Sequence, residues 1–439
     1  MTEKPRKPDP RRCLVEALHR WERRDKFAAD LLEEIWRKTN FSGPDRALIT
    51  ATLNGVIRRK LTLDWLIDRF SSRRAPARTG FARQILRLSL FHLLYLDTIP
   101  PHAILHQAGE LARKLISPGE RSYLNGLLRS VQRAGDRLPF PDQKDRAAYL
   151  SVVHSHPRWL VKRWGESRGW EEAEEICRAD NLPPPVFARC NRLKTIPGEL
   201  AGVFAREGVT WTPVPGREEI GPIKSPRPLV ELDSFKDGLF LVQDISTLRP
   251  VELLAPAPGE RIADLCAAPG GKTVYISEKM EKTGRLLAAD PSGFRLKKLR
   301  ENLERSGAGP VLVRRIDLLK IKPGRGGGIW DGILLDVPCS NTGVLRRRVD
   351  ARWRIGYDDL LRLAKQGLSL LDAAAGRVRA GGRIVYSTCS LEPEENGEVV
   401  RKFLQGRGDF SLEEEETGLP REEGGDGYYA ARLRKTGSV

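Results

Sequence analysis

Residues 382–396 contain the side chains best suited to covalent chemistry. Residues 384–386 (Ile-Val-Tyr) predict a short buried strand entered from a glycine turn, and Pro393 with the two glutamates after it predicts the first turn of a helix. Cys389 therefore falls in a strand-to-helix connection, where ligands bind in open α/β sheets and where a thiol can become a reactive thiolate. Because an isolated cysteine is more often a small buried hydrophobe, this position alone leaves both interpretations open.

A second cysteine follows another predicted strand. Residues 335–343 (Leu-Asp-Val-Pro-Cys-Ser-Asn-Thr-Gly) place Asp336 at the strand end and Cys339 in the connection behind it. We therefore expect Cys339 and Cys389 to face the same cleft. All six histidines lie at or before position 156, so acid–base chemistry in the C-terminal half must use cysteine, carboxylate or lysine.

Four predicted strands end in, or run directly into, a carboxylate: Asp264, Asp290, Asp317 and Asp336. Each alone could cap a helix, but four in succession favour a ligand with several donors, such as ribose hydroxyls and an adenine amino group. The loop after the first of these strands ends in Gly-Gly-Lys-Thr (residues 270–273), which also matches the end of a phosphate-binding P-loop. Cys266 stands where that motif requires glycine, so a nucleotide triphosphatase is the weaker alternative.

The pattern around these residues predicts a multidomain protein. Residues 1–140 predict an all-helical bundle with helices such as 46–70, 82–96 and 103–115, and residues 141–237 predict a small mixed α/β subdomain. Residues 238–439 predict a Rossmann-like α/β domain with a parallel sheet. Its expected strands are 261–265, 285–289, 311–316, 332–335 and 383–386, and its expected helices include 293–306 and 358–375.

The charge balance favours a polyanionic partner. Lys and Arg total 75 against 58 Asp and Glu, a formal net charge of +17, although residues 413–416 are all glutamate. Nucleic acid is the partner we expect, because phosphates attract clustered basic groups. A solvated surface and an RNA-binding face fit the basic residues of the helical bundle equally well: Arg58, Arg59, Lys60, Arg73, Arg74, Arg78, Arg83 and Arg87.

Other features argue against a metal site and a membrane. The six cysteines show no CxxC spacing, and His154 and His156 have no third ligand near them in sequence, so we expect these histidines to pack or to contact RNA. The most apolar run, residues 85–96, is too short to cross a bilayer. The charged, proline-rich start is unlike a signal peptide, and we expect a cytoplasmic monomer.

Two resemblances connect these motifs. Residues 45–48, 90–96, 99–104 and 123–129 resemble the NusB-like fold, an all-helical RNA-binding module. Residues 264–273, 336–343 and 386–396 resemble the RsmB/Sun family of 16S rRNA cytosine-5 methyltransferases, and the fused NusB-like region points to that branch. The resemblance implies S-adenosylmethionine (SAM) as methyl donor and RNA, 16S rRNA above tRNA or large-subunit rRNA, as substrate. A non-catalytic RNA-binding assembly factor is the other alternative.

The resemblance also implies roles for individual residues. Cys389 would add to C6 of the target cytosine, Cys339 would assist removal of the C5 proton, and Asp336 with Lys272 would hold the polar edge of the base. The basic residues of 346–354 would bind phosphates. The implied cofactor site comprises Cys266, Ala267, Ala268, Pro269, Gly270, Gly271 and Lys272, with Asp290, Arg295, Asp317 and Asp336.

Overall fold

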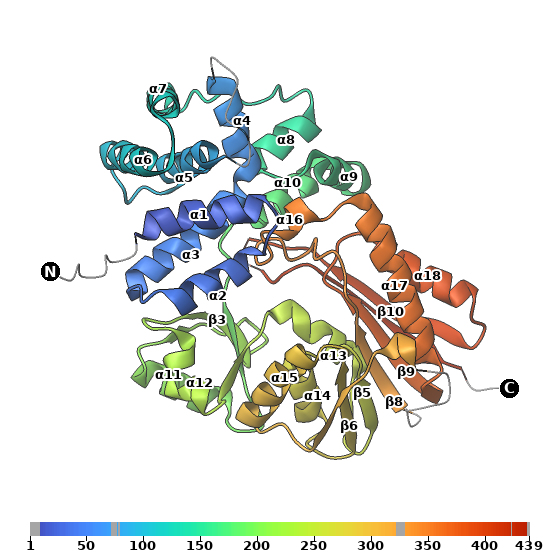
Figure 1. Cartoon of the computed structure of the whole chain (residues 1–439). Coiled ribbons are helices and arrows are strands. Elements are labelled where there is room, and N and C mark those ends of the chain that lie inside the picture. Colours follow the sequence, from blue (N-terminus) through green and yellow to red (C-terminus); the bar gives the residue numbers. More distant parts are fainter. Residues whose placement is uncertain (1–8, 72–76, 78–79, 322–329, 423, 437–439) are drawn as a thin grey trace. The chain divides into compact units, whose positions relative to one another are not determined.

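The structure, a computed structural model, describes residues 9–71, 77, 80–321, 330–422 and 424–436 (Figure 1). Three residues of the predicted basic set, Arg73, Arg74 and Arg78, lie outside these ranges. The chain divides into two compact units. The first contains Met1–Leu182 and Arg348–Arg354, and the second contains Pro183–Arg347 and Ile355–Val439.

The first unit is helical, as predicted for the N-terminal region. The expected helix 46–70 is two helices, because the backbone turns at Arg59 between α3 and α4. Its helices are α1 (Pro10–Glu22), α2 (Ala28–Lys38), α3 (Gly43–Arg58), α4 (Lys60–Phe70), α5 (Phe81–Tyr95), α6 (Pro101–Leu115), α7 (Pro118–Ala134), α8 (Arg146–His154), α9 (Arg158–Arg168), α10 (Trp170–Ala179) and α16 (Ala351–Arg354). In the described part of the chain, no helix is long and apolar enough to cross a membrane.

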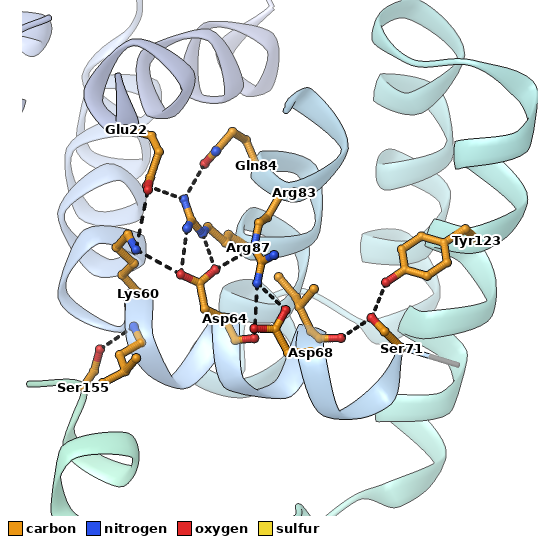
Figure 2. A network of polar contacts seen from close by, with 12 residues as sticks. Glu22, Lys60, Asp64, Asp68, Ser71, Arg83, Gln84, Arg87, Tyr123 and Ser155 are labelled. Carbon is orange, nitrogen blue, oxygen red and sulfur yellow. Dashed lines mark hydrogen bonds and ion pairs between the residues drawn. The ribbon is translucent and has the colours of Figure 1, made fainter. Parts of the chain in front are cut away.

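Two arginines predicted to lie on the surface of the bundle are instead buried. The side chains of Arg83 and Arg87 are 4% and 1% exposed, and both donate to the carboxylate of Asp64 in α4 (Figure 2). Lys60 donates to the same carboxylate, and Glu22 accepts from Arg87. The expectation of a solvated or RNA-binding face is therefore wrong for Arg83 and Arg87, whose charges are neutralised inside the unit.

The short segment 348–354 belongs to the first unit although it lies far along the chain. Asp350 accepts from the indole N–H of Trp21 and from the backbone N–H of Ala28 at the start of α2. The guanidinium of Arg352 is buried and donates to backbone carbonyls and to one side-chain amide oxygen of the unit. Trp353 donates from Nε1 to the carbonyl oxygen of Ile57 at 2.7 Å. This segment thus supplies hydrogen-bond partners that the helices around it require.

The second unit begins with a four-stranded antiparallel sheet in the order β2-β3-β1-β4. Apolar side chains from β1, β4 and α11 form its core, with Ala188, Phe204 and Phe240 almost fully buried. Its elements are β1 (Phe187–Cys190), α11 (Pro197–Arg206), β2 (Thr210–Trp211), β3 (Ile220–Lys224), η1 (Leu229–Glu231), α12 (Asp233–Lys236) and β4 (Phe240–Val242). The predicted strand near residues 238–244 corresponds to β4.

A seven-stranded sheet in the order β10-β11-β9-β8-β5-β6-β7 forms the rest of the second unit. The five strands from β9 to β7 are parallel, as predicted, and β11 and β10 add an antiparallel edge that was not predicted. The strands are β5 (Arg261–Asp264), β6 (Arg285–Asp290), β7 (Val311–Arg315), β8 (Trp330–Asp336), β9 (Val378–Thr388), β10 (Phe410–Gly418) and β11 (Tyr428–Lys435). The glutamates of residues 413–416 lie in the edge strand β10, where charge discourages pairing with another chain.

Both faces of this sheet are covered by helices (Figure 1). Alternate strand residues point to opposite faces, so Ala263 packs in the core with α17 and α18 while Ile262 packs in the core with α13 and α14. The helical elements are η2 (Ile245–Leu248), α13 (Arg249–Leu254), α14 (Gly271–Lys279), α15 (Gly293–Ser306), η3 (Leu318–Lys320), α17 (Tyr357–Ala375), η4 (Pro393–Glu395) and α18 (Gly397–Gln405). The predicted glycine turn before β9 is an irregularity within that strand, where Gly381 has a φ of 69° and the register with β8 shifts.

Candidate active site

The carboxyl ends of the five parallel strands lie along one edge of the sheet. In the order of the sheet, this edge carries Cys389 after β9, Asp336 at the end of β8, Asp264 at the end of β5, Asp290 at the end of β6 and Asp317 after β7. The cysteine connections thus occupy one end of the row, and the strands with the remaining carboxylates occupy the other. Such an edge can bind two ligands side by side.

The two cysteines predicted to share a cleft are in contact. Cys339 Sγ and Cys389 Sγ lie 3.1 Å apart, which confirms the predicted juxtaposition. Both residues are partly exposed, and the cysteines of the chain are free thiols. The hydrogen bond with Cys389, together with burial, raises the pKa of the Cys339 thiol well above its usual value. Cys339 is therefore protonated at neutral pH and can donate to its neighbour.

A buried carboxylate fixes the two connections to each other. Glu395 accepts from the backbone N–H of Ser340 at 2.8 Å and from the hydroxyls of Ser340 and Ser390. Burial raises the pKa of this carboxyl group, although the three donors oppose the shift. The backbone N–H of Gly343 also donates to the carbonyl oxygen of Cys389 at 2.9 Å. The relative position of the two sulfur atoms is thus set by hydrogen bonds that are shielded from water.

Lys272 and Asp336 form an ion pair beside the sulfur atoms. Lys272 Nζ lies 2.7 Å from Asp336 Oδ2, and the hydroxyl of Ser387 donates to Oδ1 at 2.9 Å. Burial alone would lower the pKa of Lys272, but the attraction of Asp336 outweighs it and raises the pKa. Asp336 pairs with Ser387 across β8 and β9, two residues before Cys389, so the ion pair lies beside the connection that contains the candidate nucleophile. The structure therefore brings Lys272, Asp336, Cys339 and Cys389 together.

The loop after β5 approaches the edge with its backbone. Gly270 has a φ of 107°, a conformation that favours glycine, and it precedes α14, so the N-terminal amides of the helix border the loop. Within the loop, Ala267 donates its backbone N–H to the carbonyl oxygen of Ala289, and burial raises the pKa of the Cys266 thiol. Burial also raises the pKa of Asp264 to about 7, although the hydroxyl of Thr273 donates to it at 2.7 Å.

Two further predicted residues meet at the end of β6, and a third, Asp317, follows the neighbouring strand β7. Asp290 is buried, accepts from the N–H of Ser292 and pairs with Arg295, whose Nη1 lies 2.9 Å from Asp290 Oδ2. Arg295 also donates to the carbonyl oxygen of Ala268 and so connects β6 to the loop after β5. Asp317 caps the turn η3 and pairs with Lys320.

The geometry weakens the P-loop alternative. Both side chains that such a loop would direct at phosphate and Mg²⁺ are bound to carboxylates, Lys272 to Asp336 and Thr273 to Asp264. A phosphate contact would require both bonds to be replaced.

The prediction that residues 346–354 bind phosphates is wrong for Arg346 and Arg352. Both side chains are almost fully buried. Arg346 donates to Asp426 and to the carbonyl oxygens of Arg421 and Gly424, and Arg352 is bound within the first unit. Both guanidinium groups donate to acceptors of the protein itself, so these two arginines serve the fold.

The predicted histidines are also structural. His154 and His156 are largely buried, burial lowers the pKa of both imidazoles, and His156 Nε2 lies 3.4 Å from Asp180. Within the residues that the structure describes, no cluster of three potential metal-ligating side chains was found.

The arrangement offers one nucleophile, one neighbouring thiol and one polar pair. Sequence reasoning missed Ser387, Glu395 and Asn341 as contributors. All three lie within the two cysteine-containing motifs, residues 335–343 and 382–396. Their partners in the other motif lie about 50 residues away in sequence, and no local pattern signals such pairs. Glu395 in particular was predicted only as part of the first turn of a helix, and the structure shows that its side chain is buried.

Comparisons with known proteins identify the family of the chain. The family described as 16S rRNA methyltransferase RsmB/F matches residues 251–434, the NusB family matches 8–133, and a ferredoxin-like domain of RsmF/B-like methyltransferases matches 156–226. "Probable ribosomal RNA small subunit methyltransferase B" of Bacillus subtilis is 33% identical over 98% of this chain and 100% of its own length. "Ribosomal RNA small subunit methyltransferase B" of Escherichia coli O1:K1 is 35% identical over 90% of this chain and 91% of its own. The solved structure of PH0851 has a TM-score of 0.79 at 25% identity and covers 98% of this chain and 100% of its own.

Proposed function

Because this chain belongs to the RsmB/F family of 16S rRNA methyltransferases, we propose that it methylates C5 of a cytosine in 16S rRNA through a covalent cysteine adduct. The single observation that carries the chemical part of this proposal is the 3.1 Å contact between Cys339 Sγ and Cys389 Sγ at the carboxyl edge of the sheet. C5 of cytosine is a poor nucleophile, and a thiolate that adds to C6 increases the electron density at C5. A site with two adjacent thiols supplies both a nucleophile and a second group for proton transfer.

Cys389 is the nucleophile in this proposal. Its thiol first loses its proton to solvent. The thiolate Sγ then forms a bond to C6, and the electron pair of the C5–C6 double bond becomes available at C5. After methyl transfer, the C5 proton passes to a base, and the electron pair that it leaves re-forms the double bond and expels the Cys389 thiolate. Cys339, protonated and in contact with Cys389, is the group placed to assist that proton transfer through a water that it orients.

The Lys272–Asp336 pair matches the polar edge of cytosine. That edge presents an amino donor at C4 and acceptors at N3 and O2, so a carboxylate and an ammonium group can bind it together. Their 2.7 Å contact orients both groups before the base arrives, which lowers the cost of organising the site. Ser387 holds the second carboxylate oxygen in place.

The neighbouring strand ends fit SAM, which would supply an electrophilic methyl group on a sulfonium. Asp290 is a buried carboxylate at a strand end, the usual place for an acidic group that binds ribose hydroxyls. Residues 266–272 form the loop beside it, and Gly270 has a positive φ that favours glycine and packs against Leu299 of α15. Arg295 holds the loop and Asp290 together, so we assign it a supporting role. Asp317 remains a candidate at the outer end of the row.

We propose that both units of the chain bind the RNA substrate. The base must leave its stack to reach the edge of the sheet, which favours a single-stranded or looped segment. The match of residues 8–133 to the NusB family supports a role for the helical unit in binding RNA. We propose that the chain acts as a monomer, and the boundaries at residues 140 and 237 stay predictions.

The test is to map 5-methylcytosine in 16S rRNA from cells that carry the wild-type protein, the Cys389→Ser variant or neither. We expect one cytosine to lose its methyl group in the last two cases, while calorimetry shows that purified Cys389→Ser still binds SAM. Cys13→Ser is the matched control, because Cys13 is a partly exposed thiol of the first unit far from the site in sequence. Retained methylation with Cys389→Ser would remove this residue from the mechanism.

A second variant separates the roles of the two thiols. Cys339→Ala can form the adduct but lacks the group that assists proton removal, so we expect a protein–RNA species that resists denaturant on a gel. Normal methylation without that species would refute the role of Cys339. Methylation of tRNA or large-subunit rRNA instead would refute the proposed substrate and leave the proposed chemistry standing. RNA binding without SAM binding would favour a non-catalytic assembly factor.

A further inference from the structure

The two thiols of the site lie close to the geometry of a disulfide. Their Sγ atoms are 3.1 Å apart, and a disulfide bond is about 2 Å long, so the sulfur atoms need to approach by about 1 Å. Cys339 and Cys389 follow the neighbouring parallel strands β8 and β9, in which Asp336 lies opposite Ser387. Neighbouring strands are about 4.8 Å apart, and the Cα atoms of a disulfide are usually about 4.4 to 6.8 Å apart. The backbone thus places the two side chains within reach of each other for this bond.

The hydrogen bonds that hold the two connections together do not use the sulfur atoms. Ser340 and Ser390 directly follow the two cysteines, and their hydroxyl oxygens lie 3.1 Å apart. Both hydroxyls donate to the buried carboxylate of Glu395. Because these contacts fix the backbone on both sides, each thiol already has the other as its neighbour. Groups held together in this way react far faster with each other than with a group in solution.

We propose that Cys339 and Cys389 form a site of reversible oxidation, at which hydrogen peroxide converts the two thiols to a disulfide. The Cys389 thiolate attacks one peroxide oxygen and the O–O bond breaks, which gives the Cys389 sulfenic acid and a hydroxide that is protonated to water. Cys339 Sγ then bonds to the Cys389 sulfur, and the S–O bond breaks as the hydroxyl leaves with the proton of Cys339 as a second water. The two thiols lose two electrons, and the peroxide gains them.

The contact between the thiols decides how far oxidation proceeds. Both cysteines are partly exposed, so peroxide can reach them. A sulfenic acid without a neighbouring thiol is oxidised further to sulfinic acid, which dithiols do not reduce. With Cys339 in contact, Cys389 is held instead as a disulfide that thiol–disulfide exchange returns to two thiols. Because the disulfide occupies the proposed nucleophile, methyl transfer stops while the bond is closed. That consequence, unlike the oxidation itself, rests on the proposed function.

The test treats the reduced full-length protein, without RNA or SAM, with hydrogen peroxide and maps its tryptic peptides by mass. Arg346 and Arg383 lie between the two cysteines, so trypsin places the cysteines in separate peptides. We expect wild type to yield the two peptides joined by a disulfide, and dithiothreitol to restore both thiols. In Cys339→Ala, Cys389 should become sulfinic acid that dithiothreitol does not reverse. Cys13→Ser is the matched control and should behave as wild type, because Cys13 is a partly exposed thiol of the first unit.

Activity of the wild-type protein gives the second readout. Oxidised wild type should lose methylation and regain it after dithiothreitol. Recovery of both cysteines as thiols after peroxide, or sulfinic acid at Cys389 of wild type to the same extent as in Cys339→Ala, would overturn the proposal. Mass mapping requires no methyl transfer. Absence of 5-methylcytosine from the reaction of the reduced wild type would therefore refute the proposed function and leave the oxidation result unaffected.

Discussion

Asp64→Asn tests whether the buried charge network stabilises the first unit. The Asp64 carboxylate, 5% exposed, accepts four charge-assisted hydrogen bonds: from Arg83 Nε at 2.9 Å, from Arg87 Nε at 2.8 Å and Nη2 at 2.7 Å, and from Lys60 at 3.0 Å. Asparagine keeps one acceptor oxygen and removes the charge. Breaking a buried ion pair costs about 3 to 5 kcal/mol, and Glu22 still compensates Arg87, so we expect a loss of about 3 kcal/mol.

The assay is urea unfolding followed by tryptophan fluorescence. Every tryptophan except Trp211 and Trp330 belongs to the first unit, so the signal reports mainly on that unit. Asp68→Asn is the matched control: Asp68 also accepts from Arg83, but its side chain is 49% exposed, and exposed pairs contribute about 0 to 1 kcal/mol. Equal midpoints for the two variants would refute the reasoning.

The pH dependence of the same variant supplies a second check. Burial alone would raise the pKa of Asp64, but Arg87, Lys60 and Arg83 lower it below its usual value. A lowered carboxyl pKa contributes stability above the unfolded value of about 3.9, and this contribution is lost as the pH falls through the folded value. The difference between wild type and Asp64→Asn should therefore be constant near neutral pH and shrink below about pH 4. A difference that grows on acidification would contradict the sign.

Three further predictions concern other buried groups. Because burial raises the pKa of Asp264 from about 3.9 to about 7, stability should be lost as the pH rises between these values. Asp264→Asn should therefore unfold at higher urea than wild type at pH 8, by roughly 3 to 4 kcal/mol, and by a much smaller margin at about pH 5. Glu395→Gln replaces an acceptor of three hydrogen bonds and should lower the methylation rate about tenfold, whereas Glu398→Gln, on the exposed side of α18, should not. Arg352→Met removes a buried donor of several hydrogen bonds and should shift the tryptophan transition by about 3 kcal/mol; an unchanged midpoint would show that segment 348–354 is not required for stability.

The sequence predicted the elements of the parallel sheet well, because each strand is a short apolar run bounded by turn residues. Helix α15 has the predicted bounds, and α17 begins one residue earlier than predicted. The antiparallel edge escaped prediction because β10 contains four successive glutamates, which are uncommon in strands and resemble a solvated tail. Its pairing with β11 and the ion pairs of Glu413 with Arg432 and Arg434 compensate for this composition.

Contacts between distant residues set the limit of the sequence argument for the site. The cysteines were identified because their connections follow adjacent strands, and that argument needs only the order of the strands. The burial of Arg83 and Arg87 could not be foreseen, since it depends on Asp64 and Glu22 in other helices. The same holds for Glu395, whose hydrogen bonds join two connections that the sequence separates by 50 residues or more.

Residues 348–354 have a practical consequence for dissecting the protein. A fragment that ends at residue 182 would lack Arg352 and Trp353, and a chain that starts after the helices would retain them with no carbonyls to bind. Neither piece is expected to fold as it does in the intact chain. Experiments with fragments or with exchanged domains would therefore measure misfolding and not the loss of RNA binding. The contribution of the helical region to RNA selection is better measured with substitutions at exposed positions of the intact protein. In a chimera with a relative, the N-terminal helices and this seven-residue segment would have to come from the same parent protein.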